Sequence, residues 1–275
     1  MPYRFCGIVL EQSNPTVRRD DVEISIVVPV FQEEASIRPF LESLCPILQG
    51  LTSNYEVIFC MDPGRDRTAE VIGEAINSDP RLKLLVMTRR WGQPACTMAG
   101  IENSSGRACI VMDVDLQDPP ELIPTMYAKW KDGFEVVYAQ RQRRTGETAF
   151  RLVGAYIFYW IVDRISEVKI PRNTGDFRLI DRKVVDHLRA LKEIHGYLRG
   201  LVSYVGYRQT SVLFDRPERK AGRSNYSQMW GSLRIFFNGI VAFSGRPLTV
   251  ATMIGMTIVG LCVRKEIEKQ LRFAR

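Results

Sequence analysis

The sequence predicts an α/β protein with a mainly parallel central sheet and helices on both faces. Short apolar runs rich in β-branched residues alternate four times with segments of helical periodicity. The connections between these segments are short, which favours strands and helices that pack as neighbouring layers. Polar and acidic residues follow the ends of the apolar runs, where ligands bind in open α/β sheets.

The alternation begins at Glu23, after a lead-in of residues 1–22 that has no strong period. Residues 24–30 are nearly all apolar and β-branched, which predicts a strand covered on both faces. Ser36 is expected to cap the helix that follows and ends at about residue 48. Further strands are expected at 55–61, 82–87 and 108–112, and further helices at about 68–77 and 93–103.

The pattern continues beyond residue 120 with a helix to about residue 131 and a strand at 135–139. An aromatic helical run follows at 150–165, and residues 173–179 predict a glycine turn that carries an acid. Residues 182–204 are expected to be helical. They contain His187 and His195, which lack neighbouring metal ligands and are therefore interpreted as surface or packing residues.

The C-terminal part has a different character. Residues 227–246 predict an amphipathic helix that lies in a membrane interface, with a buried globular helix as the alternative. Residues 247–263 contain no charge and predict a hydrophobic membrane segment, although it is shorter than the roughly 20 residues that a span requires. A core helix is the rival interpretation. A charged tail, residues 264–275, follows.

Composition narrows the functional classes. The net charge of +7 is concentrated in clusters at 141–144 and 216–223, which indicates an anionic partner. Aromatic residues are not interleaved with these clusters, so we expect no nucleic-acid partner.

No Gly-x-Gly-x-x-Gly follows the first strand and no phosphate-binding P-loop motif occurs. The six cysteines form no Cys-x-x-Cys pair and are expected to be reduced. No signal peptide is expected.

An acidic cluster follows the strand expected at 108–112. Asp113, Asp115 and Asp118 fall at or just beyond its end. Crowded carboxylates repel one another unless a cation lies between them, and Mg²⁺ or Mn²⁺ is commonly held by one or two carboxylates together with substrate phosphates. An ordinary turn is the alternative. Right-handed crossovers would place Glu33, Asp62, Arg89 and Asp113 on one rim of the sheet.

Together these motifs resemble family 2 glycosyltransferases with the GT-A fold, in particular the polyprenyl-phosphate glycosyltransferases. The likeness covers about residues 23–249 and implies a catalytic domain at 23–226. The residues that carry it occur in the family's order: Val28-Pro29-Val30 with Glu33; Asp62 with Asp66 and Thr68; Arg90 with Gly92; the run 113–120; residues 175–179; Leu198-Arg199-Gly200; and the basic segment 216–226.

The resemblance implies roles for individual residues. The residues implied to bind the nucleotide-sugar donor are Pro29, Glu33, Asp62, Arg90, Asp113 and Asp115. The implied metal, Mg²⁺ or Mn²⁺, would be held by Asp113, Asp115 and Gln117. The acceptor-phosphate set is Arg141, Arg151 and Arg216. The implied catalytic set is Asp115, Asp176, Arg141 and Arg216.

The implied activity is inverting transfer of one sugar from a nucleotide sugar, of UDP-glucose or GDP-mannose type, to a polyprenyl phosphate. The implied location is the cytoplasmic face of the inner or plasma membrane, and a homo-oligomer is left open. Met61 and Ala155 depart from the family pattern. They motivate one alternative, a catalytically impaired membrane-associated binding protein with the same fold. The other alternative is a GT-A transferase with a non-lipid glycan acceptor.

Overall fold

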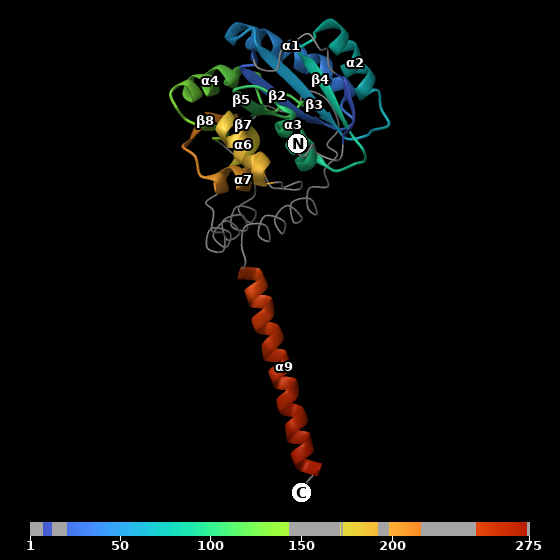
Figure 1. Ribbon diagram of the computed structural model, residues 1–275, viewed down its shortest axis with the longest axis vertical. Coiled ribbons are helices and arrows are strands. Elements are labelled where there is room, and N and C mark those ends of the chain that lie inside the picture. The colour runs from blue at the N-terminus through green and yellow to red at the C-terminus, as the bar shows by residue number, and fades with distance from the viewer. Residues whose placement is uncertain are drawn as a thin grey trace. The chain divides into compact units, whose positions relative to one another are not determined.

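The computed structural model of the protein describes residues 8–12, 21–142, 171, 173–191, 198–215 and 246–273 (Figure 1). The chain divides into two units, residues 1–147 with 170–226 and residues 148–169 with 227–275. The first unit contains the sheet and the helices around it. The second unit contains the long helix α9 (Arg246–Phe273).

The described strands of the first unit form one eight-stranded sheet in the order β1-β4-β3-β2-β5-β7-β6-β8. Four of the seven neighbouring pairs are parallel and three are antiparallel, which confirms the predicted class. The strands are β1 (Ile8–Gln12), β2 (Ile24–Val30), β3 (Tyr55–Met61), β4 (Leu82–Met87), β5 (Ala108–Val111), β6 (Val136–Arg141), β7 (Thr174–Asp181) and β8 (Gln209–Phe214).

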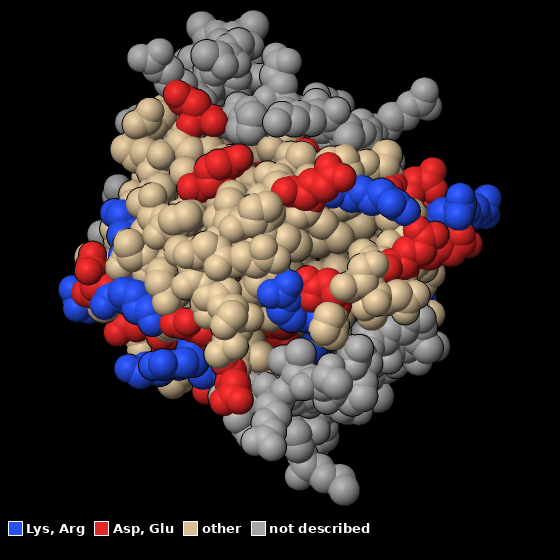
Figure 2. Space-filling view, turned by 90° about the horizontal axis from the view of Figure 1, so that it is seen from above, with Lys and Arg blue, Asp and Glu red and all other residues tan. Residues whose placement is uncertain are grey.

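Helices cover both faces of this sheet, as Figure 1 shows. One layer consists of α1 (Glu34–Leu51), α2 (Thr68–Ser78), the short 3₁₀ turn η2 (Pro120–Leu122) and α4 (Ile123–Lys131). The opposite layer consists of α3 (Gln93–Asn103), α6 (Arg182–Leu191) and α7 (Leu198–Val205). Figure 2 shows the side with α1, α2 and α4, where acidic and basic side chains are interspersed and neither sign forms a broad patch.

Apolar burial holds α1 on the sheet. Ile37, Phe40, Leu44 and Leu48 recur at helical spacing and are fully buried. Burial of each such side chain contributes roughly 2 kcal/mol relative to an exposed position. All seven residues of β2 are also buried, as expected for a central strand covered on both faces.

The start of α1 differs from the sequence prediction. The N-cap is Glu33, and Ser36 lies inside the first turn rather than capping it. The Ser36 hydroxyl donates a hydrogen bond of 2.7 Å to the Glu33 carboxylate. The expected serine cap was therefore wrong, because the helix begins two residues before Ser36 and the Ser36 hydroxyl donates its hydrogen bond to the Glu33 carboxylate.

Three strands were not predicted. Residues 8–12 of the expected lead-in form β1, which pairs antiparallel with β4. Residues 174–179 of the expected glycine turn at 173–179 belong to β7, which lies antiparallel between β5 and β6. Strand β8 pairs in parallel with β6. The polar residues Asp176 and Arg178 interrupt the apolar pattern of β7, although Arg178 is only 3% exposed.

The described residues of the helical region expected at 182–204 form α6 and α7. Residues 192–197, which include His195, lie outside the described residues, as do the aromatic run at 150–165 and residues 227–245 of the interfacial helix expected at 227–246. In the second unit, α9 extends from the expected hydrophobic segment through most of the charged tail. Within the described part of the chain, no helix combines the length and apolar character that a membrane crossing requires.

A buried charged group lies near the amino ends of the strands. The Glu56 carboxylate on β3 is fully buried and accepts hydrogen bonds from Lys83 Nζ at 2.6 Å and from Ser25 Oγ at 2.5 Å. The Ser105 backbone N–H donates to the same carboxylate at 2.6 Å. These bonds tie β2, β3, β4 and the loop before β5 to one another.

Replacing Lys83 by Met is expected to destabilise the fold by about 3 kcal/mol, because it leaves the Glu56 carboxylate buried without its cation. Urea unfolding measures the loss. Arg38→Met is the matched control, since Arg38 forms an ion pair with Glu74 in which both side chains are more than half exposed. That variant should lose less than about 1 kcal/mol. Equal losses in the two variants would contradict the prediction.

Candidate active site

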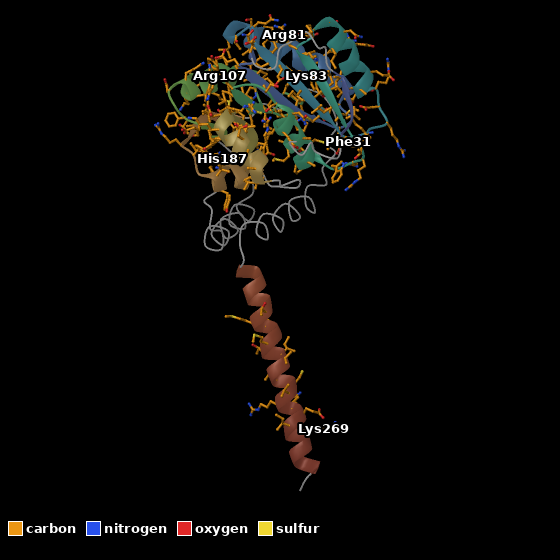
Figure 3. All side chains as sticks on the ribbon, in the orientation of Figure 1. Phe31, Arg81, Lys83, Arg107, His187 and Lys269 are labelled. Atoms are coloured by element: carbon orange, nitrogen blue, oxygen red, sulfur yellow. The ribbon has the colours of Figure 1, made fainter. Side chains whose placement is uncertain are left out.

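The strand directions bring the expected site residues to one edge of the sheet. Strands β2, β3, β4 and β5 run in parallel, and β6 runs in the same direction because β7 is antiparallel to both β5 and β6. Glu33, Asp62, Arg89 and Asp113 follow the carboxyl ends of these strands, so they lie on the predicted common rim. Figure 3 shows Phe31, which follows β2, at the opposite end of the strands from Arg81, which precedes β4.

The acidic turn after β5 is closed by its own carboxylates. The Asp113 backbone N–H donates to Asp118 Oδ2 at 3.1 Å, and the Gln117 N–H donates to Asp115 Oδ1 at 3.0 Å. Leu116 has φ +59°, a left-handed conformation that is uncommon for a residue with a Cβ. Asp115 and Asp118 are buried. Asp118 therefore shapes the turn that presents Asp113 and Asp115.

Asp62 makes a contact that sequence analysis missed. Its side chain is buried and accepts hydrogen bonds from two consecutive backbone N–H groups, those of Trp91 at 2.9 Å and Gly92 at 2.7 Å. Gly92 has φ +90°, which favours glycine at this position. The carboxylate expected to contact the donor thus also holds the loop between β4 and α3.

The loops after β2 and β3 are tied together. The Glu33 backbone N–H donates to Thr68 Oγ1 at 2.9 Å, and the Thr68 hydroxyl donates to Asp66 at 2.6 Å. Pro29 is buried within β2, level with Cys60 of β3. The motif residues of these two loops therefore form one hydrogen-bonded structure at the rim.

Two arginines of the loop between β4 and α3 lie over aromatic rings. The Arg90 guanidinium carbon is 4.1 Å from the ring centre of Phe31, and that of Arg89 is 3.7 Å from the ring of Trp91. Both arginines are exposed. Such stacks restrict the guanidinium planes while leaving positive charge at the rim.

Arginines surround Asp176 at the beginning of β7. Arg199 Nε donates to Asp176 Oδ1 at 2.9 Å, and Arg178 Nη2 donates to the neighbouring Gly175 carbonyl at 2.8 Å. The Arg141 backbone N–H bonds to the Asn173 carbonyl at 3.0 Å, which places Arg141 beside the same segment.

These arginines keep Asp176 ionised. Burial alone raises the pKa of the Asp176 carboxyl. The guanidinium groups of Arg199, Arg178 and Arg141 outweigh burial and hold this pKa below its ordinary value. Asp176 is therefore a carboxylate near neutral pH, suited to orienting cations and poorly suited to accepting a proton.

The pairing register of β5 and β7 relates the position of the acidic turn to that of Asp176. Val111 of β5 lies opposite Arg178 of β7, so Asp113 and Asp176 follow at corresponding positions beyond this pair. The acidic turn and the arginine-rich segment are therefore neighbours across adjacent strands. Arg151 and Arg216, the other expected acceptor-site arginines, lie outside the described residues.

The side-chain oxygens of the acidic turn suit a hard divalent cation. Asp113, Asp115 and Gln117 offer side-chain oxygens, which Mg²⁺ and Mn²⁺ prefer. No group of three His, Cys, Asp or Glu side chains that could hold a metal occurs among the described residues. A site of this kind fits an ion that takes its remaining ligands from substrate phosphates and water.

Other reactive side chains lie away from this edge or are buried. His187 is exposed on α6, where its Nδ1 lies 2.8 Å from the Lys183 carbonyl oxygen, in agreement with a surface role. All described cysteines are free thiols. Burial raises the pKa of the Cys109 thiol to about 12, so this group is not a ready nucleophile.

Comparison with known proteins gives three findings. A model of the family described as Glycosyl transferase family 2 matches residues 25–189. The uncharacterized glycosyltransferase YkcC of Bacillus subtilis is 42% identical over 239 residues, which cover 87% of this chain and 74% of that protein. The bactoprenol glucosyl transferase of Shigella phage SfV is 36% identical over 240 residues, or 87% of this chain and 78% of that protein.

Among solved structures, glucosyl-3-phosphoglycerate synthase from Mycobacterium tuberculosis in complex with phosphoglyceric acid is similar with a TM-score of 0.52. It is 19% identical, and the match covers 82% of this chain and 80% of that chain. At this identity the likeness concerns the fold.

Asp62→Ala is expected to lower the free energy of unfolding by about 2 kcal/mol, because two backbone N–H groups lose a charged acceptor. Urea unfolding measures this effect. Asp132→Ala, a change at an exposed aspartate after α4, should stay within about 0.5 kcal/mol of wild type. If Asp62→Ala weakened nucleotide binding with unchanged stability, Asp62 would act on the donor alone.

Proposed function

The chain belongs to glycosyl transferase family 2, and we propose that it transfers one sugar from a nucleotide-sugar donor to a polyprenyl phosphate at a membrane surface. The family match and the relatives above 30% identity establish the membership. The polyprenyl acceptor is suggested by the name of the bactoprenol glucosyl transferase relative. The observation that carries the proposal is the juxtaposition of the acidic turn with the arginine-rich start of β7.

The acceptor supplies its own nucleophile. A phosphate monoester has a second pKa of about 6 and is mostly a dianion at neutral pH. One of its oxygens forms a bond to the anomeric carbon while the bond from that carbon to the diphosphate oxygen breaks, and the electron pair leaves with the nucleoside diphosphate. Attack from the opposite side inverts the configuration. No general base is required. The lowered pKa of Asp176 makes this carboxylate a weak base, in keeping with that mechanism.

The residues of the site have separate tasks. Asp113 and Asp115, with Gln117, would hold Mg²⁺ or Mn²⁺, which supplies positive charge to the departing diphosphate. Arg141, with Arg151 and Arg216, would bind the acceptor phosphate, since guanidinium groups match phosphate in shape and charge. Asp176 orients the neighbouring guanidinium groups, while Glu33, Asp62 and Arg90 belong to the donor side.

The exposed apolar side chains of α9 support a membrane location. Large apolar side chains on this helix are more than half exposed, among them Met253, Ile254, Met256, Val259 and Leu261. Exposed apolar side chains in this number along one helix favour contact with lipid. We propose that α9 attaches the enzyme to the cytoplasmic face of the membrane, where a lipid-linked phosphate is accessible.

UDP-glucose is the first proposed donor, on the strength of the bactoprenol glucosyl transferase relative, and GDP-mannose and UDP-N-acetylhexosamines follow. Two alternatives remain distinct from the main proposal: a non-lipid glycan acceptor, and an impaired binding protein. The second is contradicted if radiolabelled sugar appears in a lipid extract after incubation with the purified protein. A panel of nucleotide sugars, tested with polyprenyl phosphate and Mn²⁺ or Mg²⁺, identifies the donor.

Asp115→Ala is expected to lower metal-dependent sugar transfer by about a hundredfold or more, because the leaving diphosphate loses stabilisation of its developing charge. Transfer of radiolabelled sugar to polyprenyl phosphate measures the loss, and an unchanged unfolding midpoint shows that the fold is intact. Asp132→Ala serves as the control. Full activity in Asp115→Ala would refute the assigned role.

Arg141→Ala is expected to raise the KM for polyprenyl phosphate by about tenfold or more, because a charged hydrogen bond to phosphate is lost. The KM for the nucleotide sugar should change little. Arg141→Lys keeps the positive charge but lacks the planar guanidinium group, so its KM for polyprenyl phosphate should lie between those of wild type and Arg141→Ala. An enzyme whose acceptor is an uncharged glycan would instead show similar acceptor KM values in all three forms.

A further inference from the structure

A side chain outside the expected site residues contacts the first aspartate of the acidic turn. Gln93 Nε2 donates a hydrogen bond of 2.8 Å to Asp113 Oδ1, across 20 residues of sequence. Gln93 is the first residue of α3, and Asp113 follows β5. The bond therefore joins the amino-terminal end of α3 to the turn after β5, at the carboxyl edge of the sheet.

The position of Gln93 is fixed by the loop that precedes it. The backbone N–H groups of Trp91 and Gly92 are bound to the buried Asp62 carboxylate, at 2.9 and 2.7 Å. The first turn of α3 is closed by a hydrogen bond of 3.2 Å from the Cys96 N–H to the Gly92 carbonyl. Residues 95–101 of this helix are all buried. The backbone of Gln93 therefore has little freedom to move, which limits where its side-chain amide can reach.

The main chain of Asp113 is fixed as well. Its N–H is bound to Asp118 Oδ2 at 3.1 Å, so rotation of the side chain is the principal remaining freedom of this residue. A neutral amide that donates to Oδ1 restrains this rotation without adding charge beside Asp113 and Asp115. Groups that orient metal-binding carboxylates in this way commonly change metal affinity by about tenfold to a hundredfold when they are removed.

We propose that Gln93 is a positioning residue that holds the Asp113 carboxylate in the orientation required for binding the divalent cation. Gln93 touches neither substrate nor the reacting atoms in this role, and it acts through Asp113. The inference rests on the proposed function, because it assigns Asp113 and Asp115 to the cation. The inference adds Gln93, a residue of α3 that is not part of the acidic turn.

The test is a Mn²⁺ titration of the full chain, followed by the loss of the electron paramagnetic resonance signal of the free aqueous ion. UDP and GDP are present in separate titrations, and protein-free titrations are subtracted. The variants are Gln93→Met, Gln93→Ala and Asp115→Ala. Gln49→Met is the matched control, since Gln49 is an exposed helical glutamine on α1. Unfolding midpoints identify any variant that fails to fold.

Gln93→Met and Gln93→Ala are expected to raise the Kd for Mn²⁺ by about tenfold. Gln49→Met should remain within about twofold of wild type, and Asp115→Ala should lose binding. Saturating Mn²⁺ should restore the kcat of the Gln93 variants, which a general loss of structure would not allow. A wild-type Kd in both folded Gln93 variants would overturn the inference.

The result for Asp115→Ala separates this inference from the proposed function. If Asp115→Ala loses Mn²⁺ binding while both Gln93 variants keep it, only the role of Gln93 is wrong. If wild type binds no Mn²⁺, or Asp115→Ala binds it as wild type does, the proposed metal site is wrong and the role of Gln93 falls with it.

Discussion

The close packing of α3 against β2 and β3 is the constraint on which the geometry of the site depends. At Gly100, an added Cβ would lie 2.3 Å from Val27 Cγ1 and 2.7 Å from Cys60 Sγ, so the helix lies on the strands only because this residue has no side chain. Arg189 of α6 donates to three carbonyl groups at the carboxyl end of α3. Asp62 holds the loop at the other end. A helix fixed at both ends places its first residue reproducibly at the rim.

The strands and helices between residues 24 and 111 could be predicted because hydrophobic periodicity is a local property and their connections are short. Strand β7 could not be predicted on that basis. Gly175 and Asp176 are typical of turns, and the buried Arg178 interrupts the apolar run. Only pairing with β5 and β6 makes this segment a strand, and those partners are distant in sequence.

The same distinction applies to the site. The position of Asp113 and Asp115 at the end of a buried strand is encoded within a few residues, so the acidic turn was foreseen. The contacts of Asp62 with Trp91 and of Gln93 with Asp113 span 29 and 20 residues. A glutamine at the start of a helix or an aspartate in a loop has no local sequence signal for such a partner, since its bond depends on how distant segments meet after folding.

The charge distribution explains why orientation matters more than proton transfer in the proposed reaction. Both substrates carry phosphate, so carboxylates at the rim repel them unless a cation is bound, whereas guanidinium groups attract them. An acceptor that is already ionised needs no base. Asp176, held ionised by Arg199 and its neighbours, lowers the cost of gathering several arginines at the start of β7. The protein therefore has to fix where each charge lies, and hydrogen bonds between neighbouring loops accomplish this.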